Sequence, residues 1–370
     1  MFLLFYIMLL IFFLYALLIV RYAIGWKKIK YNPDKNFFPR VSVVIAVRNE
    51  EKHIDSLVSS LRAQVYPFEK IEFIIVNDHS TDNTLSLLEH ADLSNLKLLN
   101  VPHNHSGKKY AINMAVSEAK GEIILASDAD CSFSSNWIQT IVRYFKNNNV
   151  NFVSGPVFFH KQSGFFQSFQ ALEFASLIGS GAGAIGIQNP IFCNGANMAY
   201  RKDVFLQLSN FKKDNIVSGD DVFLLHNIKA NFPNSIVFAK DNNAVVITES
   251  MKNFRDFINQ RKRWTAKSSA YTDITSVYIS YLVLSTNVIF SVLFLTGFLN
   301  FISLRYFFGF FIFKYLADLC LLLPTLKFFK RQDLIKWIFL FELFYSFYII
   351  LVVILSFTNK FEWKDRIHKK

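Results

Sequence analysis

Two long apolar stretches enclose a polar middle region in this chain. Residues 2–20 and residues 274–304 carry no charged side chain. An α-helix rises about 1.5 Å per residue, so about 20 apolar residues cross the hydrocarbon core of a bilayer. The pattern predicts an N-terminal transmembrane helix in residues 1–26, a polar domain in residues 27–272, and a membrane region with a basic tail in residues 273–370.

The C-terminal region divides into three apolar segments, at about residues 276–300, 306–326 and 337–357. The middle segment contains Lys314 and Asp318, which lie four positions apart and can pair inside a membrane. If all three segments cross, the basic tail ends outside, against the tendency of Lys and Arg to stay in the cytoplasm. Two topologies stay open, because the middle segment either spans the membrane or is re-entrant.

The polar middle region alternates between strand-like and helix-like patterns. Short β-branched and aliphatic runs cover residues 41–47, 71–76, 96–101 and 122–127. Helix-like segments follow the first three runs, over residues 50–64, 85–89 and 109–119. Strands that alternate with helices are typical of a largely parallel sheet with helices on both faces. The sequence therefore predicts an α/β domain.

Polar or charged residues follow every strand of this predicted sheet. Ligands of such sheets bind outside the carboxyl ends of the strands, so these residues would share one edge. Asp128 and Asp130 come at the end of the fourth strand. One helix N-cap needs one acceptor, and two close carboxylates repel each other unless a cation lies between them. The pair therefore indicates a Mg²⁺ or Mn²⁺ site that also uses the phosphates of a ligand.

Charge and cysteine content indicate a cytoplasmic polar domain and argue against nucleic acid as a partner. Basic residues follow the first apolar run, at Arg21, Lys27, Lys28 and Lys30. This order favours a retained helix over a cleaved signal peptide, and it places the polar domain in the cytoplasm. Much of the net charge of +12 lies beside apolar segments, where anionic lipid headgroups explain it better than nucleic acid does. Three widely spaced cysteines imply no disulfide framework.

Several short motifs, in a fixed order, extend this prediction. They are VSVVIAVRNE, IIVNDHSTDNT, SGKKYAINMA, EIILASDAD, CNGAN, SGDD and QRKRW. Across residues 40–266 the chain resembles family 2 glycosyltransferases of the GT-A fold, a Rossmann-like nucleotide-sugar domain. The DxD motif at residues 128–130 and the QxxRW motif at residues 260–264 make it similar to lipid glycosyltransferases and to the catalytic core of cellulose and chitin synthases.

The resemblance implies a nucleotide-sugar donor site at the sheet edge. The residues that it assigns to donor binding are Ala46, Arg48, Glu50, Asp78, Lys108, Asp128 and Asp130. Asp78 would hydrogen-bond the nucleotide base, and Asn77 stands where the family has another aspartate. Asp130, with Asp128, would hold the divalent cation against the diphosphate, whose charge grows as the nucleotide leaves. Lys108 would add a positive charge near the phosphates.

The same resemblance implies an inverting reaction and an acceptor site. Asp221 would be the general base that takes the proton of the acceptor hydroxyl. Asp220 would orient the acceptor or the base, or cap the next helix. Gln260, Arg263 and Trp264 share one helix face by their spacing. Arg263 would meet the diphosphate, and Trp264 would form a wall of the acceptor site.

Two further segments have interpretations of their own. Residues 163–187, rich in small and aromatic side chains, form either an interfacial helix beside the acceptor or a core helix. His103 and His105 lie in a polar loop with no third ligand nearby, so we expect them to be solvent-exposed and not to bind metal.

These features together predict an integral membrane enzyme with a cytoplasmic catalytic domain. It would move a sugar from a nucleotide-diphosphate sugar to a membrane lipid or a lipid-linked acceptor. Four apolar segments are few for a polysaccharide channel, which favours a short product over a polymer. A processive polysaccharide synthase is the alternative within enzymes, and a catalytically inactive membrane scaffold with a nucleotide-binding fold is the alternative outside them.

Overall fold

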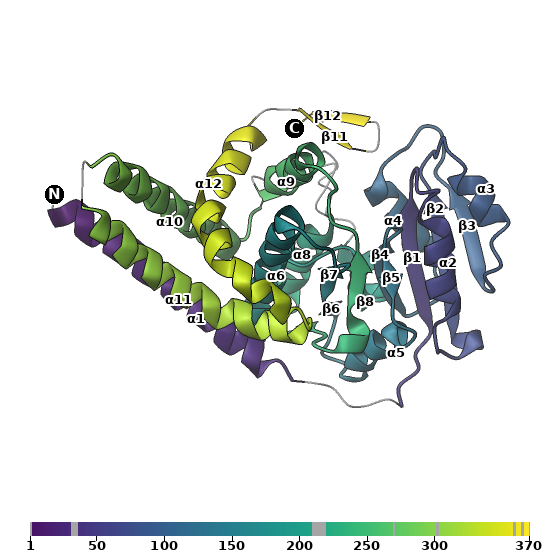
Figure 1. Cartoon of the computed structure of the whole chain (residues 1–370). Coiled ribbons are helices and arrows are strands. Elements are labelled where there is room, and N and C mark those ends of the chain that lie inside the picture. The colour runs from purple at the N-terminus through teal and green to yellow at the C-terminus, as the bar shows by residue number, and fades with distance from the viewer. Residues whose placement is uncertain are drawn as a thin grey trace.

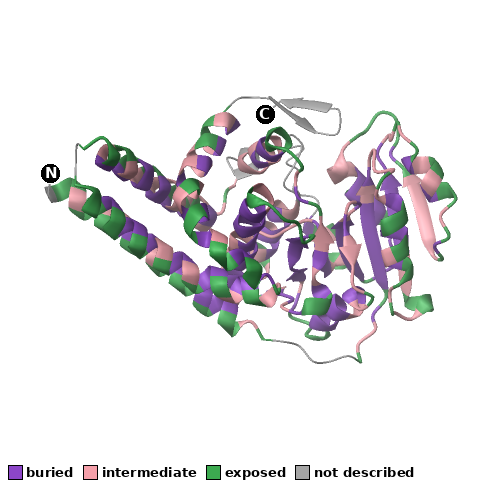
Figure 2. Ribbon diagram, viewed as in Figure 1, coloured by how far each residue is buried: buried purple, intermediate pink, exposed green. Residues whose placement is uncertain are grey.

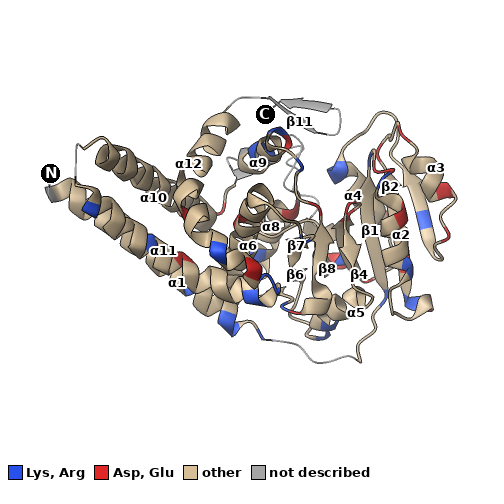
Figure 3. Ribbon diagram, viewed as in Figure 1, with Lys and Arg blue, Asp and Glu red and all other residues tan. Residues whose placement is uncertain are grey.

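The computed structural model describes residues 2–30, 36–208, 220–268, 271–300, 303–357, 360–363 and 366–369. An α/β half lies beside a group of long helices, and the N-terminus is at the end of those helices farthest from the sheet (Figure 1). Charged side chains are concentrated in the α/β half, whereas the long helices carry few of them (Figure 3).

A seven-stranded sheet in the order β3-β2-β1-β4-β8-β6-β9 forms the centre of the α/β half. Its strands are β1 (Val41–Val47), β2 (Ile71–Asn77), β3 (Leu96–Asn100), β4 (Ile123–Asp128), β6 (Phe152–Ser154), β8 (Met198–Arg201) and β9 (Ile236–Phe238). The first four are parallel, as predicted, and β8 runs antiparallel to β4 and β6. Ala46 pairs with Asp128 and Val47 pairs with Asn77, so the carboxyl ends of these strands share one edge.

The predicted helices follow the first three strands. They are α2 (Ile54–Arg62), α3 (Thr84–Glu89) and α4 (Lys108–Glu118). The apolar positions of α2 are all buried, as their spacing indicates. Further elements of this half are η1 (Phe68–Lys70), β5 (Ser132–Phe133), α5 (Trp137–Val142), η2 (Arg143–Lys146), β7 (Val157–Phe159), α7 (Lys202–Leu208), α8 (Asp220–Asn231), η3 (Asn242–Ala244), β10 (Val246–Thr248) and α9 (Phe254–Ser268).

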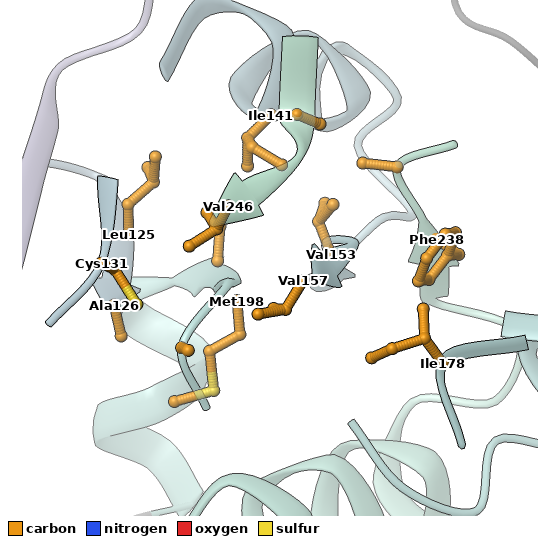
Figure 4. Close-up of a cluster of buried hydrophobic side chains, with 14 of the residues drawn as sticks. Leu125, Ala126, Cys131, Ile141, Val153, Val157, Ile178, Met198, Phe238 and Val246 are labelled. Carbon is orange, nitrogen blue, oxygen red and sulfur yellow. The ribbon is translucent and has the colours of Figure 1, made fainter. Parts of the chain in front are cut away.

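A small second sheet, β5-β10-β7, completes the core. Figure 4 shows its Val157 and Val246 near Val153 and Met198 of the main sheet and Ile178 of helix α6 (Phe165–Gly186). All five side chains are buried. The structure is therefore a mixed α/β fold with a mostly parallel sheet, which confirms the predicted fold class.

Four helices are long and apolar enough to cross a membrane. They are α1 (Phe2–Lys28), α10 (Ile274–Phe298), α11 (Leu304–Phe328) and α12 (Ile338–Ser356), the last preceded by η4 (Gln332–Trp337). Their outer faces are exposed (Figure 2). Helix α11 is one continuous helix of 25 residues, whereas a re-entrant segment requires the chain to reverse within it. These helices support association with a membrane.

Helix α12 begins and ends beside the α/β half. The preceding η4 contacts α6, and the strand β11 (Lys360–Trp363), which pairs with β12 (Arg366–Lys369), contacts α9. The described part of the basic tail therefore lies on the same side as the helix that carries the QxxRW motif.

The N-terminal helix packs tightly on α6. A Cβ at Gly183 would lie 2.4 Å from the carbonyl oxygen of Tyr22, and one at Gly25 would lie 2.0 Å from that of Gly183. Only glycine permits two helix backbones to approach so closely. Most of α6 is buried, so residues 163–187 contain a core helix, the second of the two interpretations. The sheet and the long helices share one hydrophobic cluster.

Candidate active site

Charged side chains from the end of β4, from the turn after it and from three helices, α4, α8 and α9, meet at the carboxyl edge of the sheet. Asp128 ends β4 and forms an ion pair with Lys108, the first residue of α4. Asp130 lies in the following turn, and its Oδ2 accepts a hydrogen bond of 3.2 Å from Thr248 Oγ1 of β10. The strand register thus brings the DxD carboxylates beside a cation that is distant from them in the sequence.

Asp221 and Arg263 lie near these charges. Asp221 lies in the first turn of α8, and its Oδ2 accepts a hydrogen bond of 3.1 Å from the backbone N–H of Gly195. Burial lowers the pKa of the Arg263 guanidinium, while the nearby carboxylates of Asp128, Asp221 and Asp130 oppose this change. The charges of three separate motifs therefore act on one another.

Lys108 is surrounded by the same groups. Burial alone would lower the pKa of its ammonium group, but the charge and hydrogen bond of Asp128, with the charge of Asp221, raise it overall. Lys108 therefore carries a positive charge at neutral pH, as binding of a diphosphate requires.

A cavity of about 850 Å³ lies between the strand tips and the start of α9. The predicted residues that line it are Ala46, Arg48, Glu50, Asp78, Lys108, Asp128, Asp130, Gln260 and Arg263. The prediction missed His53, Asn253, Arg255, Asp256 and Asn259, which line it too. Arg255 and Asn259 precede Arg263 at intervals of four, a spacing that could have indicated their common face.

The residues assigned to donor binding also stabilise, by hydrogen bonds, the loops in which they lie. Arg48 Nη1 donates hydrogen bonds to the carbonyl oxygens of Asp78, at 2.8 Å, and His79, at 2.7 Å. Asp78 Oδ2 accepts a hydrogen bond of 3.0 Å from the N–H of Gly107. Asn77 donates to Asn100 and accepts from the N–H of Ser80, so its amide is used in the turn after β2.

A second cavity, of about 860 Å³, continues from the same charges toward the long helices. Lys108, Asp128, Asp130, Gln260 and Arg263 line both cavities. The second cavity also reaches Asp221 and Trp264, and then apolar side chains of α6, α10 and α12. A charged centre is thus joined to an apolar space between helices that are suited to a membrane.

The structure gives different outcomes for Asp220, for the two loop histidines and for Cys131. Asp220 is the first residue of α8, but its side chain lies outside the described part of the structure, as do Ser218 and Gly219. His103 and His105 are exposed, as expected. Cys131 is buried, and burial with the charges of Asp130 and Asp128 raises the pKa of its thiol well above the usual value. This thiol stays protonated and packs in the core.

The carboxylate oxygens at this edge suit a hard divalent cation that also binds the phosphates of a ligand. Within the described ranges, no three His, Cys, Asp or Glu side chains form a group that holds a metal alone. Mg²⁺ commonly uses one or two carboxylates together with substrate phosphates. Asp130 and Asp128, at the edge of the donor cavity, match that arrangement.

Comparison with known proteins identifies the class. Residues 42–208 match the family model "Glycosyl transferase family 2". Residues 42–208 therefore carry a family 2 glycosyltransferase domain, which confirms the resemblance and supports the enzyme class predicted from the sequence.

Three curated relatives from different organisms are similar over part of their length. The glycosyltransferase AglE of Haloferax volcanii is 27% identical over 191 residues, which are 50% of this chain and 59% of AglE. An uncharacterized glycosyltransferase of Haemophilus influenzae is 33% identical over 30% of this chain and 34% of its own length. The poly-beta-1,6-N-acetyl-D-glucosamine synthase of Staphylococcus aureus is 29% identical over 43% of this chain and 38% of the synthase. The alignments span less than two thirds of each relative.

One solved structure is similar over almost the whole chain. It is the mannosyltransferase PcManGT of Pyrobaculum calidifontis, in complex with GDP-Man and Mn²⁺. The TM-score is 0.58 at 19% identity, and the match covers 94% of this chain and 96% of that one. This similarity supports the fold, including the arrangement of the long helices around the α/β half.

Proposed function

We propose that this protein is an inverting glycosyltransferase that moves a sugar from a nucleoside-diphosphate sugar to a lipid or lipid-linked acceptor. One observation carries the proposal: the cavity that contains Asp221 continues among apolar side chains of α6, α10 and α12. A lipid can keep its chain in that apolar space while its headgroup reaches the carboxylate. A water-soluble acceptor has no need of such a space.

The donor would lie in the cavity between the strand tips and α9. Arg263 and Lys108 would contact the diphosphate, and Asp78 would lie toward the nucleotide base. Asp130 and Asp128 would hold Mg²⁺ or Mn²⁺, and the similar mannosyltransferase was solved with Mn²⁺. When bound, the cation supplies positive charge to the leaving diphosphate.

Asp221 would act as the general base. As the acceptor oxygen forms its bond to the anomeric carbon, the bond from that carbon to the diphosphate oxygen breaks and Asp221 takes the hydroxyl proton. The hydrogen bond from the N–H of Gly195 fixes the orientation of the Asp221 carboxylate. Asp220 would orient the acceptor or the base, and Trp264 would form one wall of the acceptor site.

The catalytic half would face the cytoplasm of a cell whose inner membrane holds the long helices. Arg21, Lys27 and Lys28 lie at the end of α1 nearest the sheet, which suits the cytoplasmic side. The described tail lies beside α9 and would face the same side. A reporter fused after Lys30 should therefore behave as cytoplasmic, and cleavage of residues 40–266 by protease added to intact cells would contradict this orientation.

The acceptor is tested by supplying radiolabelled nucleotide sugars to membranes that contain the protein. We expect label in organic-extractable material that carries one to a few sugars. Label that appears only in long water-soluble polymer would favour a processive synthase. Absence of any sugar transfer across a full panel of nucleotide sugars would favour an inactive scaffold.

A matched pair of substitutions tests the apolar passage itself. Leu284 of α10 lines the cavity, whereas Val292 of the same helix is exposed and lies outside the cavity lining. Leu284→Trp should block transfer to lipid while Val292→Trp leaves it near the wild-type rate. Equal rates in the two variants would exclude this route for the acceptor.

A further inference from the structure

A buried polar network contacts the QxxRW helix, and its central residues are not among those assigned to donor, base and acceptor. Its centre is an ion pair between Glu173 of α6 and Arg261 of α9, whose side chains are 5% and 2% exposed. Arg261 Nη2 donates to Glu173 Oε2 at 2.6 Å, and its Nε donates to the same oxygen at 3.0 Å. This two-point contact fixes the plane of the guanidinium.

Arg261 occupies a variable position of the motif, yet it contacts the motif residues on either side. Its Nη1 donates a hydrogen bond to Oε1 of Gln260. The guanidinium carbon lies 4.3 Å from the centre of the Trp264 ring and 4.4 Å from that of Phe257. Arginine stacks in this way on aromatic faces, so the ion pair also fixes the position of the Trp264 ring.

The network extends into the apolar helices through Tyr348 of α12. Its hydroxyl donates a hydrogen bond of 2.6 Å to Glu173 Oε1, and its ring stacks on Phe257 at 5.3 Å. Glu173, Arg261, Tyr348 and Trp264 all line the cavity that contains Asp221. The wall assigned to the acceptor is therefore joined by side chains to a helix that is suited to a membrane.

A buried ion pair of this kind is not explained by stability alone. Apolar side chains of similar volume often stabilise a protein as much as a buried ion pair does, because desolvation of the charges offsets their attraction. An apolar side chain at position 261 would have no N–H group to donate to Gln260 and no guanidinium group to stack on the Trp264 ring. The ion pair thus supplies fixed geometry at two motif residues.

We propose that Glu173 and Arg261 are positioning residues that hold Gln260 and Trp264 in place, and that Tyr348 sets their position relative to α12. The inference rests on the proposed function in one respect, namely that Trp264 borders the acceptor site. It extends that proposal by naming the residues that keep the acceptor site aligned with the long helices.

The test measures transfer kinetics and donor binding for Glu173→Gln, Arg261→Lys and Tyr348→Phe in the full-length protein. Displacement of a substrate-positioning wall by about 1 Å costs up to about 100-fold in rate. We expect Glu173→Gln and Arg261→Lys to lower kcat/KM for the acceptor by about 10- to 100-fold. Tyr348→Phe, which removes one hydroxyl group, should lower it by a few-fold. The donor Kd from calorimetry should stay within about three-fold of wild type, because Arg263, Lys108 and Asp130 are untouched.

Two comparisons separate positioning from general damage. Asp241→Asn breaks an equally buried ion pair, that with Arg143, which links η2 to the turn at η3 instead of α9. It should lower thermal stability without changing the acceptor KM. In a Trp264→Ala background, Glu173→Gln should cause little further loss, since two residues that act through one another are not additive.

The inference is overturned if Glu173→Gln lowers donor affinity, acceptor kcat/KM and thermal stability together, because general damage to the fold would explain such a result. It is also overturned if the losses caused by Glu173→Gln and Trp264→Ala multiply in the double variant. Acceptor kinetics unchanged in both Glu173→Gln and Arg261→Lys would overturn it as well. If wild-type protein transfers sugar to polymer and not to lipid, the proposed function fails. The same comparison then uses the polymer as the acceptor and decides the inference separately.

Discussion

The charges at the sheet edge and the charges among the long helices are built from the same residue types but have different surroundings. At the edge, the side chains of Lys108 and Asp128 are 32% and 37% exposed. Among the long helices, the side chains of Lys314 and Glu342 are 2% and 3% exposed. A ligand can exchange partners with the first pair, whereas the second pair is closed to it.

The closed cluster joins three helices. Lys314 of α11 binds Asp318 at 2.7 Å and also Glu342 of α12. Tyr15 of α1 donates a hydrogen bond of 2.7 Å to the other oxygen of Asp318. Since a charge in an apolar region is costly unless it is paired, this cluster fixes how the helices pack. The partly exposed charges at the sheet edge therefore mark a place where a ligand can bind, whereas the buried charges among the long helices fix how those helices pack.

The largest expected effect is on catalysis at the open edge. Asp221→Asn should lower transfer by about 10²- to 10⁴-fold, because the amide cannot take the acceptor proton. Donor binding, measured by calorimetry, should be nearly unchanged. A variant that retains more than about a tenth of the wild-type turnover would assign the base elsewhere, with Asp220 as the first candidate.

Loss of the cation in the closed cluster should affect stability instead. Lys314→Met should lower the free energy of unfolding by about 3–5 kcal/mol, because it leaves Asp318 and Glu342 buried without their partner. Thermal unfolding in detergent measures this. Lys327→Met, at the exposed end of the same helix, is the control and should cost less than about 1 kcal/mol.

A rescue sharpens the same comparison. Neutral replacement of all three charges, with Asp318→Asn and Glu342→Gln added to Lys314→Met, should recover part of the lost stability. If the triple variant is less stable than Lys314→Met, the unpaired carboxylates are not the cause of the loss.

Asp130→Ala should act on donor binding through the divalent cation. A bound cation contributes several kcal/mol of charge stabilisation, so nucleotide affinity in Mn²⁺ or Mg²⁺ should fall by about 100-fold or more. Wild-type protein in chelator should behave like the variant. Asp92→Ala is the control, since the side chain of Asp92 is 91% exposed, and it should bind as wild type does. Full donor binding by wild type in chelator would exclude a cation-dependent site.

The smallest expected effect concerns one hydrogen bond between long helices. Ser346 Oγ of α12 donates a hydrogen bond of 2.7 Å to Asn287 Oδ1 of α10. Such bonds between membrane helices contribute about 0.6 kcal/mol on average, so Ser346→Ala should cost that amount in thermal unfolding. Thr296→Ala, whose hydroxyl bonds to its own helix, should cost less. A cost for Ser346→Ala as large as that for Lys314→Met would remove the distinction between charged and neutral closed contacts.

Local patterns in the sequence determined the parallel half of the sheet and its polar edge. Alternation of apolar runs with helix-like segments placed β1 to β4 close to their observed bounds. The carboxyl end of each parallel strand then brought Asp78 and Asp128 to one edge without any knowledge of the packing. Length and composition were also sufficient to find the four long helices.

Tertiary structure decided which distant side chains meet. The sequence paired Lys314 with Asp318 but gave no sign of Glu342 or Tyr15, and it did not indicate that Arg261 turns inward to Glu173. It left the burial of α6 and the place of the tail open. Periodicity states which face of a helix is apolar, whereas the angle and height at which two helices cross depend on side chains from both. Contacts between elements therefore became visible only once the helices were packed together.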